Sequence, residues 1–142
     1  MSTAVETPRD GTELIAAFLP HSPFVGLLGI EAVKLSDDGA TLRLPWRPDR
    51  ATMGDLVHGG AVASLADCAV MATAWCGAPL PEQLRGATVS MALEYAAGAR
   101  AEDVFAEGRL IRRGRSLCAV EVDLRGADGR MIGKAIASYK VG

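Results

Sequence analysis

The sequence predicts an α+β protein in which one long helix packs against a curved antiparallel sheet. Residues 58–76 are apolar at nearly every position, which is typical of a helix buried all round. Apolar and polar residues alternate along much of the remaining chain, as they do in half-buried strands. Short turns between these segments indicate antiparallel neighbours. The predicted order is β-β-α-β-β-β-β after a short N-terminal helix, with the helix forming one layer and the sheet the other.

The chain begins with a polar segment, residues 1–9, which we expect to be disordered. Residues 10–142 have the size of a single domain. Asp10 is a candidate N-cap for a short helix over 14–19, which Pro20 ends before a turn.

Alternating or apolar segments predict six strands: 30–35, 40–46, 87–95, 104–111, 117–124 and 131–140. Turn-forming residues join several of them at 36–39, 112–115 and 126–129. Residues 47–57 are predicted to be a loop that leads into the long helix. Gly77 fits the position after the end of that helix, and Pro79 and Pro81 prevent its continuation.

The composition limits the functions that fit this chain. Of 142 residues, 49% are hydrophobic and 23% are charged, and the net charge is −2, so we expect a globular protein without affinity for nucleic acid or membranes. The first residues lack the features of a signal peptide, which predicts a cytoplasmic protein. The three cysteines lack metal-ligand spacing, so we expect free thiols and no metal site.

The long helix combines two features that point to chemistry. Asp67 is its one charged residue, and we expect this carboxylate to be buried, which is costly unless the group is paired or used. Gly59 and Gly60 open the helix, where free N–H groups and the positive end of the helix dipole stabilise developing negative charge. Together these features suggest acyl transfer or hydrolysis.

The spacing of these residues constrains how they can cooperate. Asp67 lies eight residues beyond Gly59, which is about 12 Å along a helix axis. One substrate carbonyl therefore cannot reach both features in one copy of the chain. If the two act together, a two-fold axis must place Asp67 of one copy opposite the helix start of another, in an obligate homodimer with two shared sites.

The helix and its surroundings resemble the hotdog-fold acyl-CoA thioesterases, in particular the group typified by the phenylacetate-degradation thioesterase. The resemblance rests on His58-Gly59-Gly60 at the start of an apolar helix, Asp67 nine residues after the histidine, and the order of elements. It covers roughly residues 20–141.

The resemblance implies hydrolysis of a coenzyme A thioester, with coenzyme A as part of the substrate and no separate cofactor. Gly59 and Gly60 would donate N–H groups to the thioester carbonyl, and Asp67 of the partner subunit would be the nucleophile or general base. Thr88 matches a position where relatives carry a hydroxyl that orients water or the aspartate. His58 would shape the helix entry.

Further implications concern the coenzyme A moiety and the assembly. The turn 112–116, which consists of Arg112, Arg113, Gly114, Arg115 and Ser116, would lie near the nucleotide. Relatives assemble as dimers of dimers. Many relatives also carry an Asn in the loop before the His-Gly-Gly motif, whereas this chain has no Asn, so Thr52, Asp49 or Asp55 could take its place.

Other interpretations remain open at this point. The chain could be an enoyl-CoA hydratase or dehydratase of the same fold, or a non-catalytic acyl-CoA sensor. Asp67 could also be a structural carboxylate that Ser64, three residues earlier, caps. The sequence leaves the acyl group undefined, as well as the choice between coenzyme A and acyl carrier protein.

Overall fold

The computed structural model describes residues 6–142. The helices are α1 (Gly11–Phe18), α2 (Pro23–Leu28) and α3 (Gly59–Trp75), with short 3₁₀ turns at Leu19–His21 and Pro48–Arg50. The strands are β1 (Glu31–Ser36), β2 (Gly39–Leu44), β3 (Ala51–Met53), β4 (Leu56–Val57), β5 (Gly86–Tyr95), β6 (Val104–Arg113), β7 (Leu117–Gly126) and β8 (Met131–Val141).

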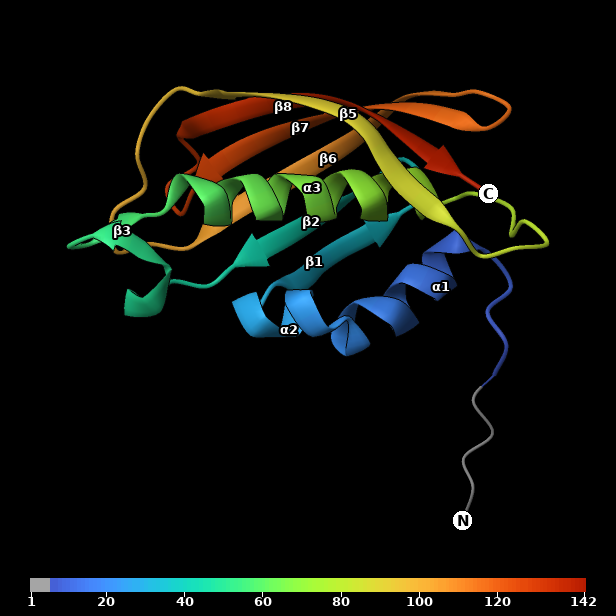
Figure 1. The fold of residues 1–142 in the computed structure, drawn as a ribbon, viewed down its shortest axis with the longest axis horizontal. Coiled ribbons are helices and arrows are strands. Elements are labelled where there is room, and N and C mark those ends of the chain that lie inside the picture. The colour runs from blue at the N-terminus through green and yellow to red at the C-terminus, as the bar shows by residue number, and fades with distance from the viewer. Residues whose placement is uncertain (1–5) are drawn as a thin grey trace, which may run out of the picture.

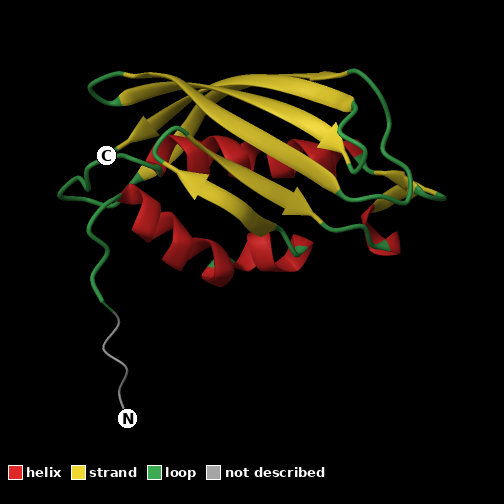
Figure 2. Cartoon of the chain, turned by 180° about the vertical axis from the view of Figure 1, so that it is seen from behind, coloured by secondary structure: helices red, strands yellow, loops and turns green. Residues whose placement is uncertain are grey.

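Six strands form one antiparallel sheet in the order β1-β2-β6-β7-β8-β5. Figure 1 shows α3 lying along this sheet, and Figure 2 shows from behind how the strands curve over it, with α1 and α2 along the β1 side. The predicted α+β architecture is confirmed. β1 and β5 are the two edges of the sheet, which matters for the site below.

The N-terminal region contains more structure than the sequence pattern predicts. Asp10 caps α1 as expected, with its carboxylate accepting the Glu13 N–H at 3.0 Å. A second helix, α2, replaces the predicted turn because Pro23 starts it and Gly29, at φ +68°, ends it. Residues 1–5 of the segment predicted to be disordered lie outside the described residues, and Arg9 pairs with Glu13.

The predicted loop 47–57 contains the small β3–β4 hairpin, which lies at the start of α3 (Figure 1). The backbone C=O of Arg50 accepts the His58 N–H at 2.7 Å, and the buried Arg50 guanidinium donates to the Leu28 C=O. The hairpin thereby holds the first residue of the site in place. At the other end of α3, Gly77 has φ +76°, as its predicted position after the helix requires.

The core lies between α3 and the sheet. Leu65, Ala69 and Val70 of α3 are fully buried, and the buried Thr73 hydroxyl accepts the Ala40 N–H at 3.2 Å. The prediction that α3 is buried all round is wrong, because the sheet covers only part of its circumference. One stripe remains open, which we call the open face of α3 and which consists of Gly60, Ser64, Asp67 and Met71.

The outer face of the sheet carries an ion-pair network. Asp123, whose side chain is 8% exposed, accepts hydrogen bonds from Arg109, Arg125 and Lys134 at 3.0–3.2 Å. Glu121 pairs with two of these cations. Among the described residues, no helix has both the length and the apolar character needed to cross a membrane.

Candidate active site

The start of α3 presents one free backbone donor. His58 is the N-cap, and its Nδ1 accepts the Gly60 N–H at 2.8 Å. A Cβ at position 60 would lie 2.9 Å from this nitrogen, so the imidazole can approach only because the residue is glycine. The Gly59 N–H has no acceptor among residues 6–142. Of the two donors that the family resemblance implies, Gly59 is therefore the available one.

The hydrogen bond at the helix start also defines the state of His58. Because Nδ1 accepts, the proton of the neutral ring lies on Nε2. The residue is exposed. His58 thus caps the start of α3.

Tyr95, at the end of β5, contacts the same helix start. Its hydroxyl donates to the Gly59 C=O at 2.8 Å, and its ring lies beside Gly59. The sequence pattern marks Tyr95 only as an apolar strand position, because a contact between residues 36 positions apart depends on how β5 crosses α3.

Asp67 lies on the open face of α3, and its predicted burial is wrong for a single chain. The Thr88 hydroxyl, from β5, donates to Asp67 Oδ1 at 2.7 Å. The structure thereby brings together the two residues that the resemblance pairs. Ser64 does not cap Asp67, because its hydroxyl donates to the Gly60 C=O at 2.8 Å. Asp67 forms no ion pair with another described residue, so its second oxygen remains available.

A groove adjoins Gly59 between the β3–β4 hairpin, α3 and the end of β5. Its volume is about 300 Å³, and Thr52, Val62 and Tyr95 line it together with Gly59. Of the three residues that could replace the Asn of many relatives, Thr52 is therefore the one that lines the groove beside Gly59. Asp55 pairs instead with Arg100, and Asp49 pairs with Arg47 and Arg50.

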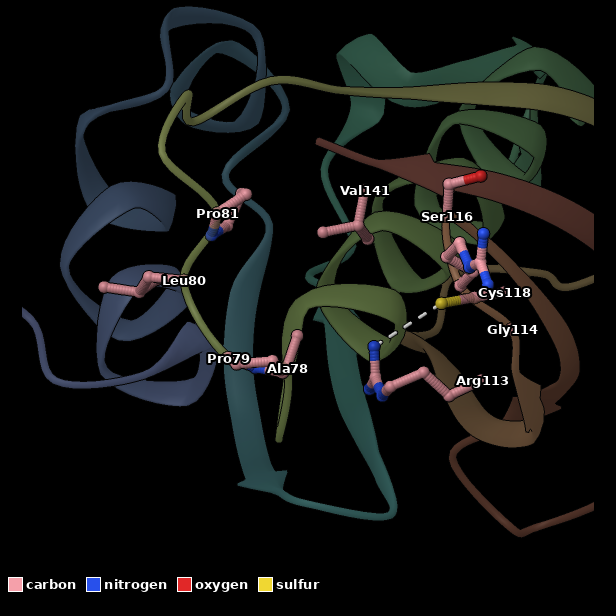
Figure 3. A pocket seen from close by; sticks show the side chains of 10 residues that line it. Ala78, Pro79, Leu80, Pro81, Arg113, Gly114, Ser116, Cys118 and Val141 are labelled. Carbon is pink, nitrogen blue, oxygen red and sulfur yellow. Dashed lines mark hydrogen bonds between the residues drawn. The ribbon is translucent and has the colours of Figure 1, made fainter.

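The turn between β6 and β7 lies at the opposite end of α3 and borders two pockets. Gly114, Arg115 and Ser116 line both of them, at about 240 and 380 Å³, and Arg112 lines the larger. Figure 3 shows the smaller pocket, with Arg113 below it. Arg112 and Arg115 form no ion pair with described residues, which leaves both guanidinium groups free for an anionic ligand.

Arg113 has a different role in the structure. Its guanidinium donates to the C=O groups of Ala74 and Cys76 at 2.8 and 2.9 Å, and it contacts Cys118 Sγ at 3.4 Å (Figure 3). A cation at these last carbonyls satisfies the negative end of the helix. The sequence analysis missed this function, since the two segments are nearly 40 residues apart.

The cysteines are unsuited to nucleophilic chemistry. All three are buried, and burial raises the pKa of Cys68 and of Cys76 to about 11 and also raises the pKa of Cys118. Their thiols are therefore protonated at neutral pH. Within residues 6–142, no group of three or more His, Cys, Asp or Glu side chains is placed to hold a metal ion.

A long helix wrapped by an antiparallel sheet, with glycines at its start and an acidic residue two turns along, defines a hotdog-fold protein of the thioesterase type. Residues 54–132, more than half of the chain, match the sequence model of the thioesterase superfamily. The chain belongs to this superfamily, which confirms the predicted family and fold.

Solved structures agree with this assignment. A mutant thioesterase from Pseudomonas aeruginosa is 27% identical, with 96% of each chain covered and a TM-score of 0.78. A hypothetical thioesterase from Streptococcus pneumoniae, solved with coenzyme A, is 21% identical, with 80% of this chain and 85% of that chain covered and a TM-score of 0.68. A mutant of the phenylacetic acid degradation protein from Thermus thermophilus is 19% identical, with 85% and 100% covered and a TM-score of 0.74.

Proposed function

We propose that this protein is an acyl-CoA thioesterase, which hydrolyses a thioester to a free acid and coenzyme A. The observation that carries this proposal is the Asp67–Thr88 hydrogen bond on the open face of α3, in a chain whose helix start offers a free Gly59 N–H. The coenzyme A in the Streptococcus relative supports this substrate class.

The active unit in this proposal is a homodimer. β5 is an edge strand of ten residues whose outer side pairs with no other described strand, and Val89 and Tyr95 on it are 59% and 54% exposed. Such an edge is a template for strand pairing. Antiparallel pairing of two β5 strands about a two-fold axis would bring the open faces of two α3 helices together. Asp67 of one copy would then face Gly59 of the partner subunit, and two such dimers would form the tetramer that the family resemblance implies.

The chemistry follows from these positions. Asp67 either attacks the thioester carbonyl or takes a proton from an attacking water, and Thr88 holds the carboxylate in place. The carbonyl oxygen becomes an oxyanion, which the Gly59 N–H and the helix dipole stabilise. The C–S bond then breaks, and the thiolate leaves and is protonated. On the general-base route the free acid forms in this step, whereas on the nucleophilic route water then hydrolyses the mixed anhydride between the acyl group and Asp67. Incorporation of oxygen from labelled water into Asp67 during one turnover identifies the nucleophilic route.

Arg112 and Arg115 are proposed to bind the phosphates of coenzyme A, because guanidinium groups match phosphate oxygens in bidentate geometry. A hydratase or dehydratase mechanism is less compatible with the site. It needs a histidine that works with an acidic partner, whereas the Nδ1 of His58 accepts the Gly60 N–H and no acidic side chain among the described residues bonds to the ring.

The test is release of free thiol from acetyl-, octanoyl-, dodecanoyl- and benzoyl-CoA. We expect Asp67→Asn to lower kcat by about 10²- to 10⁴-fold, the range for loss of a general base, with the melting temperature retained. Glu82→Gln, an exposed carboxylate in the loop after α3, is the matched control and should leave kcat unchanged. Turnover by Asp67→Asn at the parent rate contradicts the proposed function.

Subunit mixing tests the shared site. Gly59→Pro removes the backbone donor, and Asp67→Asn removes the carboxylate, so each homodimer should be nearly inactive. A heterodimer of the two variants contains one site with both groups intact, and mixing should restore a measurable fraction of activity. If the mixture stays as inactive as its components, both groups act within one chain or not at all.

A further inference from the structure

A second apolar pocket lies beside Asp67, at the C-terminal half of the open face of α3. Its volume is about 300 Å³. α1, α3, the loop before β5 and the end of β8 form its walls, through Leu14, Phe18, Met71, Trp75, Leu84 and Tyr139.

Two relations place this pocket next to the Asp67–Thr88 pair. Met71 follows Asp67 by one helical turn, so both side chains lie on the same stripe of α3. Tyr139 is the cross-strand partner of Thr88, which puts its backbone directly beside the residue that holds Asp67. Burial raises the pKa of Tyr139, and the nearby charge of Asp67 adds to this effect.

The lining is apolar and its polar atoms are paired. The Trp75 indole N–H donates to the Tyr139 hydroxyl oxygen at 3.1 Å, and both residues are buried. No charged side chain lines the pocket. Phe18 and Leu84 are 45% and 57% exposed, which leaves apolar surface at the pocket mouth for a ligand.

Part of this pocket lies outside the region that matches the superfamily. That match covers residues 54–132, whereas Leu14 and Phe18 lie well before it and Tyr139 lies after it. The acyl preference of this protein can therefore depend on residues outside the matched region.

We infer that this pocket receives the acyl group of the substrate, and that the substrate class is a thioester with an uncharged, apolar acyl group of medium length. This inference rests on the proposed thioesterase function. An apolar cavity of about 150 Å³ holds a benzene ring of six carbons, so a pocket of about 300 Å³ accommodates up to roughly twelve carbon atoms. Longer chains extend past Phe18 and Leu84 into solvent. A charged acyl group would lose its hydration without meeting a counter-ion.

Octanoyl-CoA should therefore be hydrolysed with a higher kcat/KM than acetyl-CoA, and acyl chains longer than dodecanoyl should bring no further gain. Succinyl-CoA should be at least tenfold poorer than butyryl-CoA, which has a neutral acyl chain of the same length. Phe18→Ala and Leu84→Ala should each reduce the octanoyl-to-acetyl ratio of kcat/KM about tenfold, the effect of losing a few carbon contacts in such a pocket.

The control variants separate this pocket from other apolar surface. Leu27→Ala, on α2 and 71% exposed, should leave the ratio unchanged. Leu56 lies in the groove beside Gly59, and Leu56→Ala should also leave the octanoyl-to-acetyl ratio of kcat/KM unchanged. If Leu56→Ala changes the ratio and Phe18→Ala and Leu84→Ala do not, the acyl group binds at the helix start and the inference is overturned.

A binding measurement distinguishes this inference from the proposed function. Octyl-CoA and ethyl-CoA thioethers resist hydrolysis, so calorimetry with the Asp67→Asn protein reports acyl binding without turnover. Weaker octyl-CoA binding by Phe18→Ala or Leu84→Ala supports the pocket. If the parent protein hydrolyses no thioester, that result refutes only the proposed activity. If the parent is active and neither substitution changes the affinity for octyl-CoA, the pocket assignment is refuted and the proposed activity is not.

Discussion

Replacing Gly59 with Pro exchanges the amide hydrogen of the site for the Cδ of the proline ring and leaves the helix around it nearly intact. Position 59 is the first residue of α3, where a missing N–H breaks no helical hydrogen bond. His58 has φ −62° and ψ +133°, which is the conformation that a following proline requires. A Cβ at position 59 would meet the Tyr95 ring at 3.6–3.7 Å, an ordinary contact.

The expected effect is large on catalysis and small on folding. Loss of one oxyanion donor costs about 10²- to 10³-fold in kcat, or roughly 3 to 4 kcal/mol of transition-state stabilisation. Because Pro restricts the unfolded chain, the free energy of unfolding should be unchanged or increased by up to about 1 kcal/mol. Gly59→Ala retains the N–H and serves as the matched control.

Thiol release under substrate saturation and a thermal melt measure the two effects. The result expected is a stable Gly59→Pro protein with kcat lowered at least a hundredfold, beside a Gly59→Ala protein within a few-fold of the parent. A folded Gly59→Pro protein with nearly parental kcat would refute the assignment of Gly59 as the oxyanion donor. Equal losses in both variants would point to a packing effect on Tyr95 instead.

Three further predictions concern the framework of the site. Arg113→Gln should lower the free energy of unfolding by about 2 kcal/mol, since it removes charged hydrogen bonds to the end of α3, and a melt should show a drop of roughly 8 °C. Burial alone would raise the pKa of Asp123, but hydrogen bonds from Lys134 and Arg109 outweigh it and hold that pKa below its usual value. Its contribution is therefore complete above the unfolded pKa and lost as pH falls through the folded one, so denaturation should show Asp123→Asn less stable than the parent at pH 7, with the difference shrinking as the pH falls below about 4. Cys68 and Cys76 should resist a disulfide reagent at pH 8 in the folded protein and react after unfolding, as absorbance of the released chromophore reports.

Long periodic segments were predictable from the sequence. α3 begins and ends within one residue of its predicted span, and the six main strands were placed within two or three residues. α2 and the β3–β4 hairpin were missed because six-residue helices and strands of two or three residues are too short to show a period. Local pattern therefore predicts the layers of this fold but not the small elements that fix the helix start.

The candidate site was predictable from two sources. Gly59 and Asp67 were indicated by their types and places on the helix, and His58 and Thr88 by the family resemblance; the structure brings Thr88 to Asp67. The exposure of Asp67 was not predictable, because an apolar helix does not reveal which side the sheet leaves uncovered. Arg113 at the end of α3 depends on long-range geometry that no sequence spacing encodes.

The uncovered edge of β5 also affects how readily this protein aggregates in a concentrated solution. A solitary copy would display the outward-facing backbone N–H and C=O groups of this ten-residue strand beside large apolar side chains, which is the kind of surface from which amyloid-like stacking starts. Pairing with a second copy consumes that surface. Association would then protect the chain from aggregation as well as complete its catalytic groups, so substitutions that weaken the pairing should reduce the yield of recoverable protein before any loss of turnover is measured.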